Sequence, residues 1–246
     1  MDRRSFLKQA SAYALATTWT MTNLEQIFAA TPPAKRNETR EPGKSMEHRN
    51  LGGMEVSAIG LGCLPMVGYY GGKYDKKEVL HWGLSEASAR SIRRAHSVCP
   101  LSAVQSEYAI WWREPETKIF STLQELGIGF VPYCPLGRAF LTGIINENSR
   151  FQKGDRRYNL PQFQPEALKH NMPLVYLVEE WAKHKGVTPA QFALIWMLSR
   201  KPWIVPIPGT TNPDHLDDFL GAASVRLTPY EMEEFDDAYA RIDLMG

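Results

Sequence analysis

Apolar residues recur at helical spacing through the last third of the chain. The stretch from Pro165 to Lys185 carries an apolar stripe, which is formed by Leu174, Leu177, Val178 and Trp181. Thr188 and Gln191 form a capping box before a second apolar run. Thr228 and Glu231 form another capping box before the last amphipathic stretch. These three patterns each predict a helix after residue 164.

Short apolar runs alternate with helical patterns between residues 79 and 205. The runs with the length of strands are 79–84, 103–108, 129–134 and 203–205. A helix with Ala89 and Ile92 on one face follows the first run, and a helix that starts at Pro115 and closes at Gly127 follows the second. Strands that are joined by helices run parallel, and both a (β/α)8 barrel and a doubly wound sheet fit this alternation.

A hairpin of two short strands and a third strand are expected before these units. Residues 47–59 predict a hairpin about the Gly52-Gly53 turn, and residues 57–63 then continue as a strand of small apolar residues.

The stretch from Lys201 to Asn212, KPWIVPIPGTTN, combines a predicted strand with the start of a helix. After the apolar run comes a turn at Pro208-Gly209-Thr210-Thr211, and Asn212 and Pro213 are residues suited to the N-cap and to the first helical position. Free backbone N–H groups and the positive end of a helix dipole favour a bound phosphate. Taken alone, however, this stretch is better explained as an ordinary strand-to-helix turn.

A second glycine loop, Pro135-Leu136-Gly137-Arg138, follows the preceding predicted strand. In (β/α)8 barrels the loops after the last two strands commonly form a phosphate site. Gly137 and Gly209 permit close backbone approach, and Arg138 supplies a charged donor. Two such loops after consecutive strands therefore favour an anion site over two unrelated turns.

Composition removes several classes of function. Lys and Arg number 28 against 27 Asp and Glu, so no charge excess indicates a nucleic-acid partner or an anionic membrane surface. The hydrophobic share of 43% is large enough for a substantial core and excludes intrinsic disorder as the explanation of the chain. The three widely spaced cysteines and six histidines show no metal-ligand spacing, so no metal is expected.

The N-terminus resembles a twin-arginine export signal, through Arg3-Arg4-Ser5-Phe6-Leu7-Lys8 and a short, weakly apolar stretch after it. We therefore expect an export signal over residues 1–30, a polar linker over 31–45 and a folded domain over 46–246. The resemblance implies a periplasmic location, or a cytoplasmic one if the signal is not used.

Several segments of the domain resemble the aldo–keto reductases, which are NADPH-dependent carbonyl reductases with a (β/α)8 barrel. The matching segments are RNLGGMEVSAIGLGC, HWGLSEAS, AVQSEY, the PLGRAFLTG run and IVPIPGTT. They cover nearly all of the chain after the linker, in the family's order and spacing.

The resemblance implies a set of cofactor-binding residues. Gln105 matches the residue that hydrogen-bonds the nicotinamide amide, and Tyr133 matches the aromatic residue that stacks on that ring. The pyrophosphate loop is matched by Cys134, Pro135, Leu136, Gly137 and Arg138. The adenosine-phosphate side is matched by Ile207, Gly209, Thr210 and Thr211, with His215 nearby. The implied cofactor is NADP or NAD, and the implied substrate is a small carbonyl compound.

The chain also departs from the family pattern. Asp75 to Glu78 resembles the start of the first barrel helix, yet the next residues already resemble the fifth strand. A barrel of about 250 residues spends roughly 30 on each unit, so about three units are expected to be absent. The predicted fold is thus an incomplete (β/α)8 TIM-type barrel that retains strands matching 1, 5, 6, 7 and 8.

The units that are expected to be absent carry the family's catalytic Asp, Tyr, Lys and His, so no catalytic residue is assigned. Tyr69, Tyr70 and Tyr74 are the substitutes that the sequence offers for the proton donor, although none has a partner matched to the family. Trp111 and Trp112 are the expected aromatic residues of a substrate pocket.

The positions that bind the 2′-phosphate of NADP in related sequences hold different residues here. In place of a Lys, an Arg and a Glu-Asn pair, the chain has Asn212, His215, Asp218 and Phe219. The loss of two cations weakens the preference for NADP over NAD.

Two functions remain open from the sequence. One is an aldo–keto reductase-like enzyme that transfers hydride between NAD(P)H and a carbonyl or alcohol. The other is a non-catalytic remnant that binds a nucleotide or a partner after an internal deletion. Because a partial barrel leaves open sheet edges, a homo-oligomer that covers them is also expected.

Overall fold

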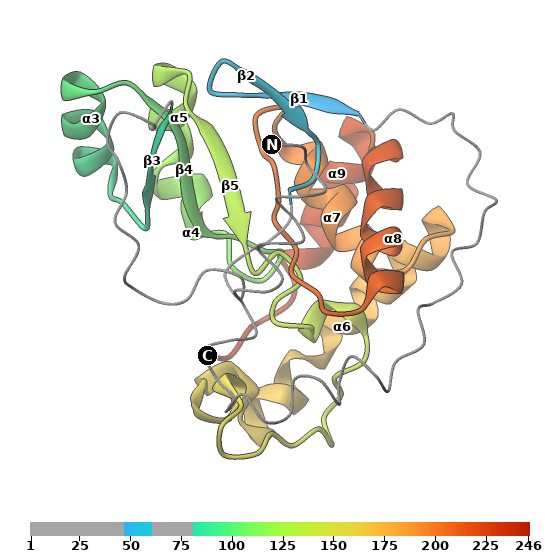
Figure 1. The fold of residues 1–246 in the computed structure, drawn as a ribbon. Helices are drawn as coiled ribbons and strands as arrows, with labels where there is room; N and C mark the ends of the chain where they lie inside the picture. The colour runs from blue at the N-terminus through green and yellow to red at the C-terminus, as the bar shows by residue number, and fades with distance from the viewer. Residues whose placement is uncertain (1–46, 61–80) are drawn as a thin grey trace, which may run out of the picture. The chain divides into compact units, whose positions relative to one another are not determined.

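The structure is a computed structural model that describes residues 47–60 and 81–246, and these belong to one compact unit (Figure 1). The predicted signal over residues 1–30, the predicted linker over 31–45 and the second half of the predicted strand 57–63 lie outside the described residues. Tyr69, Tyr70 and Tyr74 lie outside them as well.

The N-terminal hairpin is confirmed. Strand β1 (His48–Leu51) pairs antiparallel with β2 (Met54–Ser57), and the turn uses left-handed backbone at Gly52 and Gly53. At Gly52 a Cβ atom would lie 1.8 Å from the carbonyl oxygen of Ser102, so only glycine fits there. β2 ends at Ser57, and residues 58–60 do not continue as the predicted strand.

Arg49 fastens this hairpin to the end of a helix. Its guanidinium donates to the carbonyl oxygens of Leu198, Lys201 and Ile204. Burial lowers the pKa of Arg49 to about 10, mainly because the charged form loses its water. The side chain thus supplies hydrogen-bond donors, in place of water, to carbonyl groups at the end of the helix Pro189–Arg200 and just after it.

Three parallel strands form the central sheet. They are β3 (Trp82–Ser85), β4 (Leu101–Glu107) and β5 (Gly129–Tyr133), in the order β3-β4-β5 (Figure 1). The register places Gln105 beside Ser85 on one side and Val131 on the other. The three predicted strands and their parallel direction are therefore confirmed.

The fourth predicted strand, 203–205, is corrected to a single parallel bridge between Phe130 and Ile204. The segment nevertheless follows β5: Phe130 N donates to Trp203 O (3.0 Å), Val205 N to Phe130 O (2.9 Å) and Ile207 N to Pro132 O (3.1 Å). Pro132 has no N–H with which to continue the ladder, which explains why regular pairing fails. Gly60 N then donates to Pro206 O (2.9 Å), so residues from the N-terminal part extend the same layer.

Helices follow the strands and fill the C-terminal half. Their bounds are α3 (Ala89–Val98), α4 (Glu114–Lys118), α5 (Phe120–Leu126), α6 (Pro165–Lys185), α7 (Pro189–Arg200), α8 (Pro213–Gly221) and α9 (Pro229–Tyr239). Both predicted capping boxes are present, at Thr188–Gln191 and at Thr228–Glu231. The helix predicted from Pro115 to Gly127 is instead two helices, because the backbone leaves helical geometry at Ile119 (φ −131°).

Short 3-10 turns cover the connection between β5 and α6. They are Phe140–Thr142, Arg156–Asn159 and Pro161–Phe163, and a further one, Ala222–Ser224, follows α8. Residues 140, 141 and 163 in these turns are buried, so the connection packs on the core through its aromatic and aliphatic side chains.

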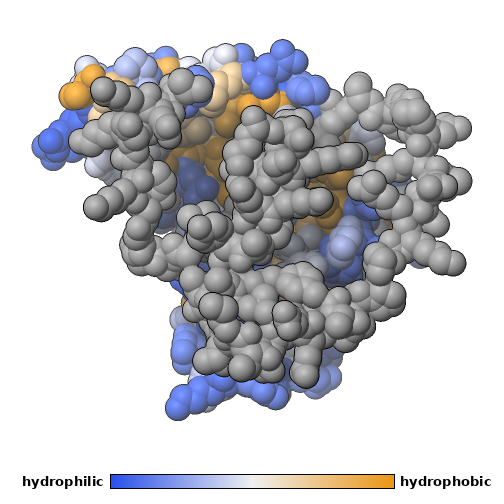
Figure 2. All heavy atoms as spheres, in the orientation of Figure 1, coloured by the Kyte–Doolittle hydropathy of each residue, from blue (hydrophilic) through white to orange (hydrophobic). Residues whose placement is uncertain are grey.

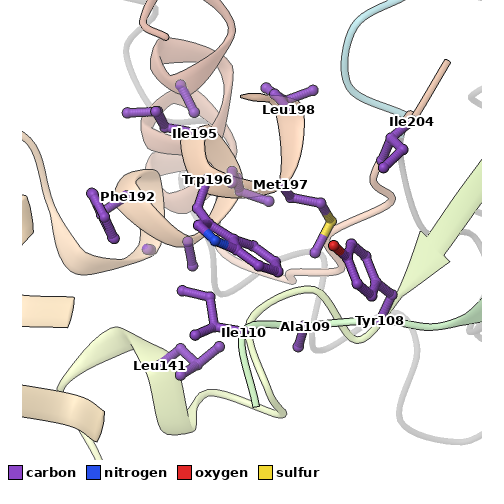
Figure 3. Close-up of a cluster of buried hydrophobic side chains, with 14 of the residues drawn as sticks. Tyr108, Ala109, Ile110, Leu141, Phe192, Ile195, Trp196, Met197, Leu198 and Ile204 are labelled. Atoms are coloured by element: carbon purple, nitrogen blue, oxygen red, sulfur yellow. The ribbon is translucent and has the colours of Figure 1, made fainter. Parts of the chain in front are cut away.

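The core lies between the sheet layer and helices α6, α7 and α9, and Trp196 is at its centre. Figure 3 shows its indole ring pointing from α7 toward residues 108–110, which follow β4. The ring centroids of Trp196 and Tyr108 are 5.4 Å apart, and both side chains are fully buried. The apolar stripes of the sequence therefore become one interior, and apolar residues also gather in the middle of the face drawn in Figure 2.

Among the residues with a described position, no helix has both the length and the apolar character needed to span a bilayer.

Candidate nucleotide-binding site

The carboxyl ends of β4 and β5 bring the two expected nicotinamide residues to one face of the sheet. Gln105 is paired with Val131, and Glu107 is paired with Tyr133, so these four side chains point to the same side. On the opposite side Val104 and Phe130 are fully buried against the helices. Gln105 and Tyr133 are half-buried and thus remain accessible in part.

The carboxylate of Glu86 interacts with Tyr133, although no motif in the sequence identifies Glu86. Glu86 follows β3 with left-handed backbone (φ 51°) and accepts a hydrogen bond from the Glu107 amide at 2.8 Å. The pKa of Tyr133 is raised, first by burial and then by its hydrogen bond to Glu86 and the charge of that carboxylate. Burial and the neighbouring Glu86 carboxylate therefore both favour the neutral form of this phenol at the end of β5.

The loop after β5 has an unusual backbone. Cys134 (φ 51°), Gly137 (φ 58°), Arg138 (φ 54°) and Ala139 (φ 74°) all adopt left-handed conformations, although three of the four carry a Cβ atom. Such conformations cost about 1–2 kcal/mol per residue for non-glycine residues. They persist because the loop is closed by backbone hydrogen bonds, including Gly137 N to Cys134 O (2.9 Å).

Trp111 supports this loop from below. A Cβ atom on Gly137 would lie 3.1 Å from the indole of Trp111, so the loop backbone rests on the ring. The same ring stacks on Phe140, with centroids 4.8 Å apart and planes inclined by 15°. Trp111 therefore packs under the predicted pyrophosphate loop, whereas its expected neighbour in a substrate pocket, Trp112, is 43% exposed.

Arg138 lies in this loop and is held by Glu107. Its Nη1 donates to Oε1 of the Glu107 carboxylate, and its Nη2 donates to Oε2 at 2.8 Å. The hydrogen bond to Glu107 raises the pKa of Arg138 above its usual range. Pro135 and Gly137 are buried and Leu136 is half-buried, so the rest of the predicted loop lies against the protein.

The second predicted loop follows the segment that pairs with β5. Ile207 is hydrogen-bonded to Pro132, so the 207–211 loop and the 134–138 loop leave adjacent parallel segments at the same edge of the layer. Gly209 is exposed, and a Cβ atom placed on it would meet no heavy atom of the described residues within 4 Å. Thr211 is exposed as well.

His215 lies beside this loop. Its Nδ1 lies 3.3 Å from Thr210 Oγ1, and Thr210 Oγ1 also accepts from the Asn212 amide at 3.0 Å. Asn212 caps α8 by accepting from the Asp214 amide at 3.0 Å, as its position predicts. The structure thus gathers Thr210 and His215 at the start of α8.

Two surface hollows lie elsewhere. One, of about 380 Å³, is lined by the β1–β2 hairpin and by residues near Gly127 and Trp203. The other, of about 640 Å³, lies between α4, α5 and the ends of α7 and α9. Neither contains a residue of the two predicted loops, so neither bears on the predicted cofactor site.

The sequence of the chain matches a known protein family. A sequence model of the aldo/keto reductase family matches residues 74–240, which is more than half of the chain. The chain belongs to the aldo/keto reductase family.

Relatives of the chain carry the same family name. The chain is 41% identical over 173 residues to a protein named probable aldo-keto reductase 1 from Glycine max, and this match covers 70% of the chain and 49% of that protein. A glycerol dehydrogenase from Gluconobacter oxydans matches in structure with a TM-score of 0.62 and 26% identity, over 66% of this chain and 49% of that one. A thermostable aldo-keto reductase solved with the inhibitor epalrestat matches with a TM-score of 0.47 and 27% identity, over 64% and 48% of the two chains.

This aldo/keto reductase chain spans about half the length of the relatives that it matches. Its described residues reproduce part of their barrel, as three parallel strands, a fourth hydrogen-bonded segment and the helices between them. By family it is an aldo–keto reductase-like oxidoreductase.

Proposed function

We propose that this chain binds a nicotinamide dinucleotide at the carboxyl ends of β4, β5 and the 203–207 segment. The observation that carries the proposal is the common position of Gln105 and Tyr133 on one face, next to two loops that leave adjacent parallel segments. Family members use NAD(P)H, and parallel-strand carboxyl ends are where such barrels bind phosphate groups.

In this proposal each part of the site meets one part of the cofactor. Gln105 hydrogen-bonds the nicotinamide amide and Tyr133 lies against that ring. Residues 135–138 contact the pyrophosphate, and residues 207, 209, 210 and 211 with His215 contact the adenosine phosphate. The half-buried position of Gln105 supports its role, because a polar side chain inside a strand requires a hydrogen-bonding partner.

The choice between NADP and NAD follows from four side chains around α8. Asn212 is occupied as the helix cap, Phe219 is buried, and Asp218 accepts a hydrogen bond from Thr188 at 2.8 Å. His215 alone among these four is exposed with a ring nitrogen directed at the predicted phosphate loop. We therefore propose that the chain binds NADPH and NADH with similar affinity.

The bound dinucleotide would supply hydride to a small carbonyl substrate, or accept it from an alcohol. We propose that the chain alone does not complete this reaction, because no residue of its sequence is matched to the family's proton donor or to its lysine. It would then act as the cofactor-binding part of an aldo–keto reductase barrel from which about three β/α units are missing.

The test is a titration of the full chain with NADPH and with NADH, followed by nicotinamide fluorescence. We expect saturable binding of both, no turnover of a panel of aldehydes and ketones, and a roughly tenfold weaker affinity for Arg138→Met. Arg150→Met is the matched control, since Arg150 bonds only carbonyl groups of its own exposed loop in the described residues.

Two outcomes would change the conclusion. No binding at high micromolar dinucleotide would reject the cofactor site. Turnover of a carbonyl compound would favour the complete enzyme instead, with Tyr69, Tyr70 or Tyr74 as the proton donor, and single Tyr→Phe variants would then identify which residue is used.

We also propose a periplasmic location, on the basis of the twin-arginine-like residues Arg3 and Arg4. Cell fractionation of the full chain and of an Arg3→Lys, Arg4→Lys variant tests this. The variant is expected to stay in the cytoplasm, and equal distribution of both chains would reject the export signal.

A further inference from the structure

In the predicted pyrophosphate loop, the guanidinium of Arg138 is already paired with a carboxylate of the protein, that of Glu107. Arg138 is paired through both terminal nitrogens with Glu107, and the two side chains are only 16% and 17% exposed. A planar, two-point guanidinium–carboxylate contact has the same geometry that Arg uses to bind phosphate oxygens. Glu107 therefore occupies the donors that an anionic ligand of this loop needs.

The position of Glu107 is fixed independently of Arg138. It is the last residue of β4, its amide donates to Glu86 at 2.8 Å, and its neighbour in the register is Tyr133. The carboxylate thus projects from the end of a strand, whereas Arg138 belongs to the loop.

Arg138 is also constrained from the loop side. Its backbone and that of Ala139 are left-handed, and its carbonyl oxygen accepts from Arg157 Nη1 at 3.3 Å. Arg157 is held in turn by Asp155, with an Nη2–Oδ2 distance of 2.7 Å. The ion pair to Glu107 therefore ties together β4, the 134–139 loop and the connection that contains residue 157.

We propose that Glu107 is a positioning residue that acts through Arg138 as a charge latch, and that a dinucleotide must displace it to obtain the guanidinium. The latch sets the affinity of the site for anions and holds the 134–139 loop closed while the site is empty. This inference rests on the proposed cofactor site for its ligand, but the latch itself is a property of the loop.

Binding of NADPH by a set of variants tests the competition. We expect Glu107→Gln to bind roughly tenfold more tightly than the wild type, since removing the charge frees Arg138. Glu107→Asp keeps the charge on a shorter side chain and should fall between the two. Glu114→Gln is the control, because it removes one charge from an exposed pair with Lys118 outside the site and should change nothing.

A double-mutant cycle separates the latch from a general charge effect. With Arg138 already replaced by Met, the further change Glu107→Gln should leave the affinity unchanged. Equal tightening with and without Arg138 would reject the latch in favour of simple repulsion between Glu107 and the ligand. Weaker binding by Glu107→Gln in the wild-type background would also reject it, because Glu107 would then be orienting Arg138 toward the ligand.

Labelling of Cys134 tests the latch without any dinucleotide. In a chain with Cys63→Ser and Cys99→Ser, Cys134 is the one remaining thiol, and it is half-buried at the start of the loop. Because loss of the Glu107 charge by itself lowers the pKa of Cys134, the rates are compared per thiolate, from their dependence on pH. On that scale Glu107→Gln should increase the rate of reaction with a disulfide reagent several-fold, and Glu114→Gln should not. An unchanged rate overturns the latch, whereas faster labelling in a chain that binds no NADPH supports the latch and rejects the cofactor site alone.

Discussion

At the scale of single residues, Gly137 has a defined structural reason to be glycine. Its φ of 58° is left-handed, and a Cβ atom would lie 3.1–3.2 Å from three atoms of the Trp111 ring. The ring is held in place because it stacks on the buried Phe140. Both the backbone conformation and the space below the loop therefore disfavour a side chain.

Gly137→Ala should lower the free energy of unfolding by about 1–2 kcal/mol, the cost of left-handed backbone at a residue with a Cβ atom. Gly209→Ala is the matched control, since a Cβ atom there meets open space, and we expect a change of less than about 0.5 kcal/mol. Urea denaturation of the three chains measures both values. Equal losses for the two variants would show that the Trp111 contact and the left-handed backbone do not set the stability of the loop.

Individual site residues could be predicted from the sequence where a local motif identifies them. The Gly and Arg of PLGR and the Asn-Pro helix start after PGTT are local patterns, and the structure places them after two adjacent parallel segments, β5 and residues 203–207. Glu86 and Glu107 could not be found in this way, because their roles depend on register between separate strands and on a left-handed residue after β3. A polar residue in a strand gives no sign of which distant cation it will meet.

At the scale of elements, the helices were predictable because their signals lie within them. Helix α6 has the bounds that its apolar stripe and Pro165 indicate, and α7 and α9 begin at their capping boxes. The prediction of a strand over 203–205 was wrong, because its pairing depends on another segment. Pro132 of β5 offers no N–H, and that constraint is absent from the 203–205 sequence itself.

The two capping boxes should differ in their contribution to stability. The Thr228 hydroxyl caps α9 and donates to Glu231 of the same helix at 3.0 Å, whereas the Thr188 hydroxyl caps α7 and donates to Asp218 of a second helix, α8, at 2.8 Å. We expect Thr228→Ala to cost about 1 kcal/mol. Thr188→Ala should cost roughly 1 kcal/mol more, because an acceptor on a second helix also loses its partner.

Chemical denaturation of both variants at one pH provides the comparison. An equal loss would show that the contact between α7 and α8 contributes nothing beyond the cap. A larger loss for Thr228→Ala would contradict the ranking altogether.

At the scale of the whole molecule, the described sheet ends at β3. This strand pairs with β4 on one side and is the edge of the three-stranded sheet, and Trp82 at its start is 48% exposed. Relatives of the chain are about twice as long as the part that it matches. In a closed barrel of this family no strand is left at an edge.

We therefore predict that the chain self-associates through β3, because an edge strand with an exposed aromatic residue is a template for pairing with another strand. Light scattering after size exclusion should give a mass of at least twice the 27.9 kDa of one chain. Trp82→Lys should shift this mass toward the monomer, since a lysine on an edge strand opposes pairing. Val98→Lys is the control, because Val98 is 88% exposed at the end of α3 and lies outside the edge strand. A wild-type chain that is monomeric at micromolar concentration, or an equal shift in both variants, would show that β3 is not the interface.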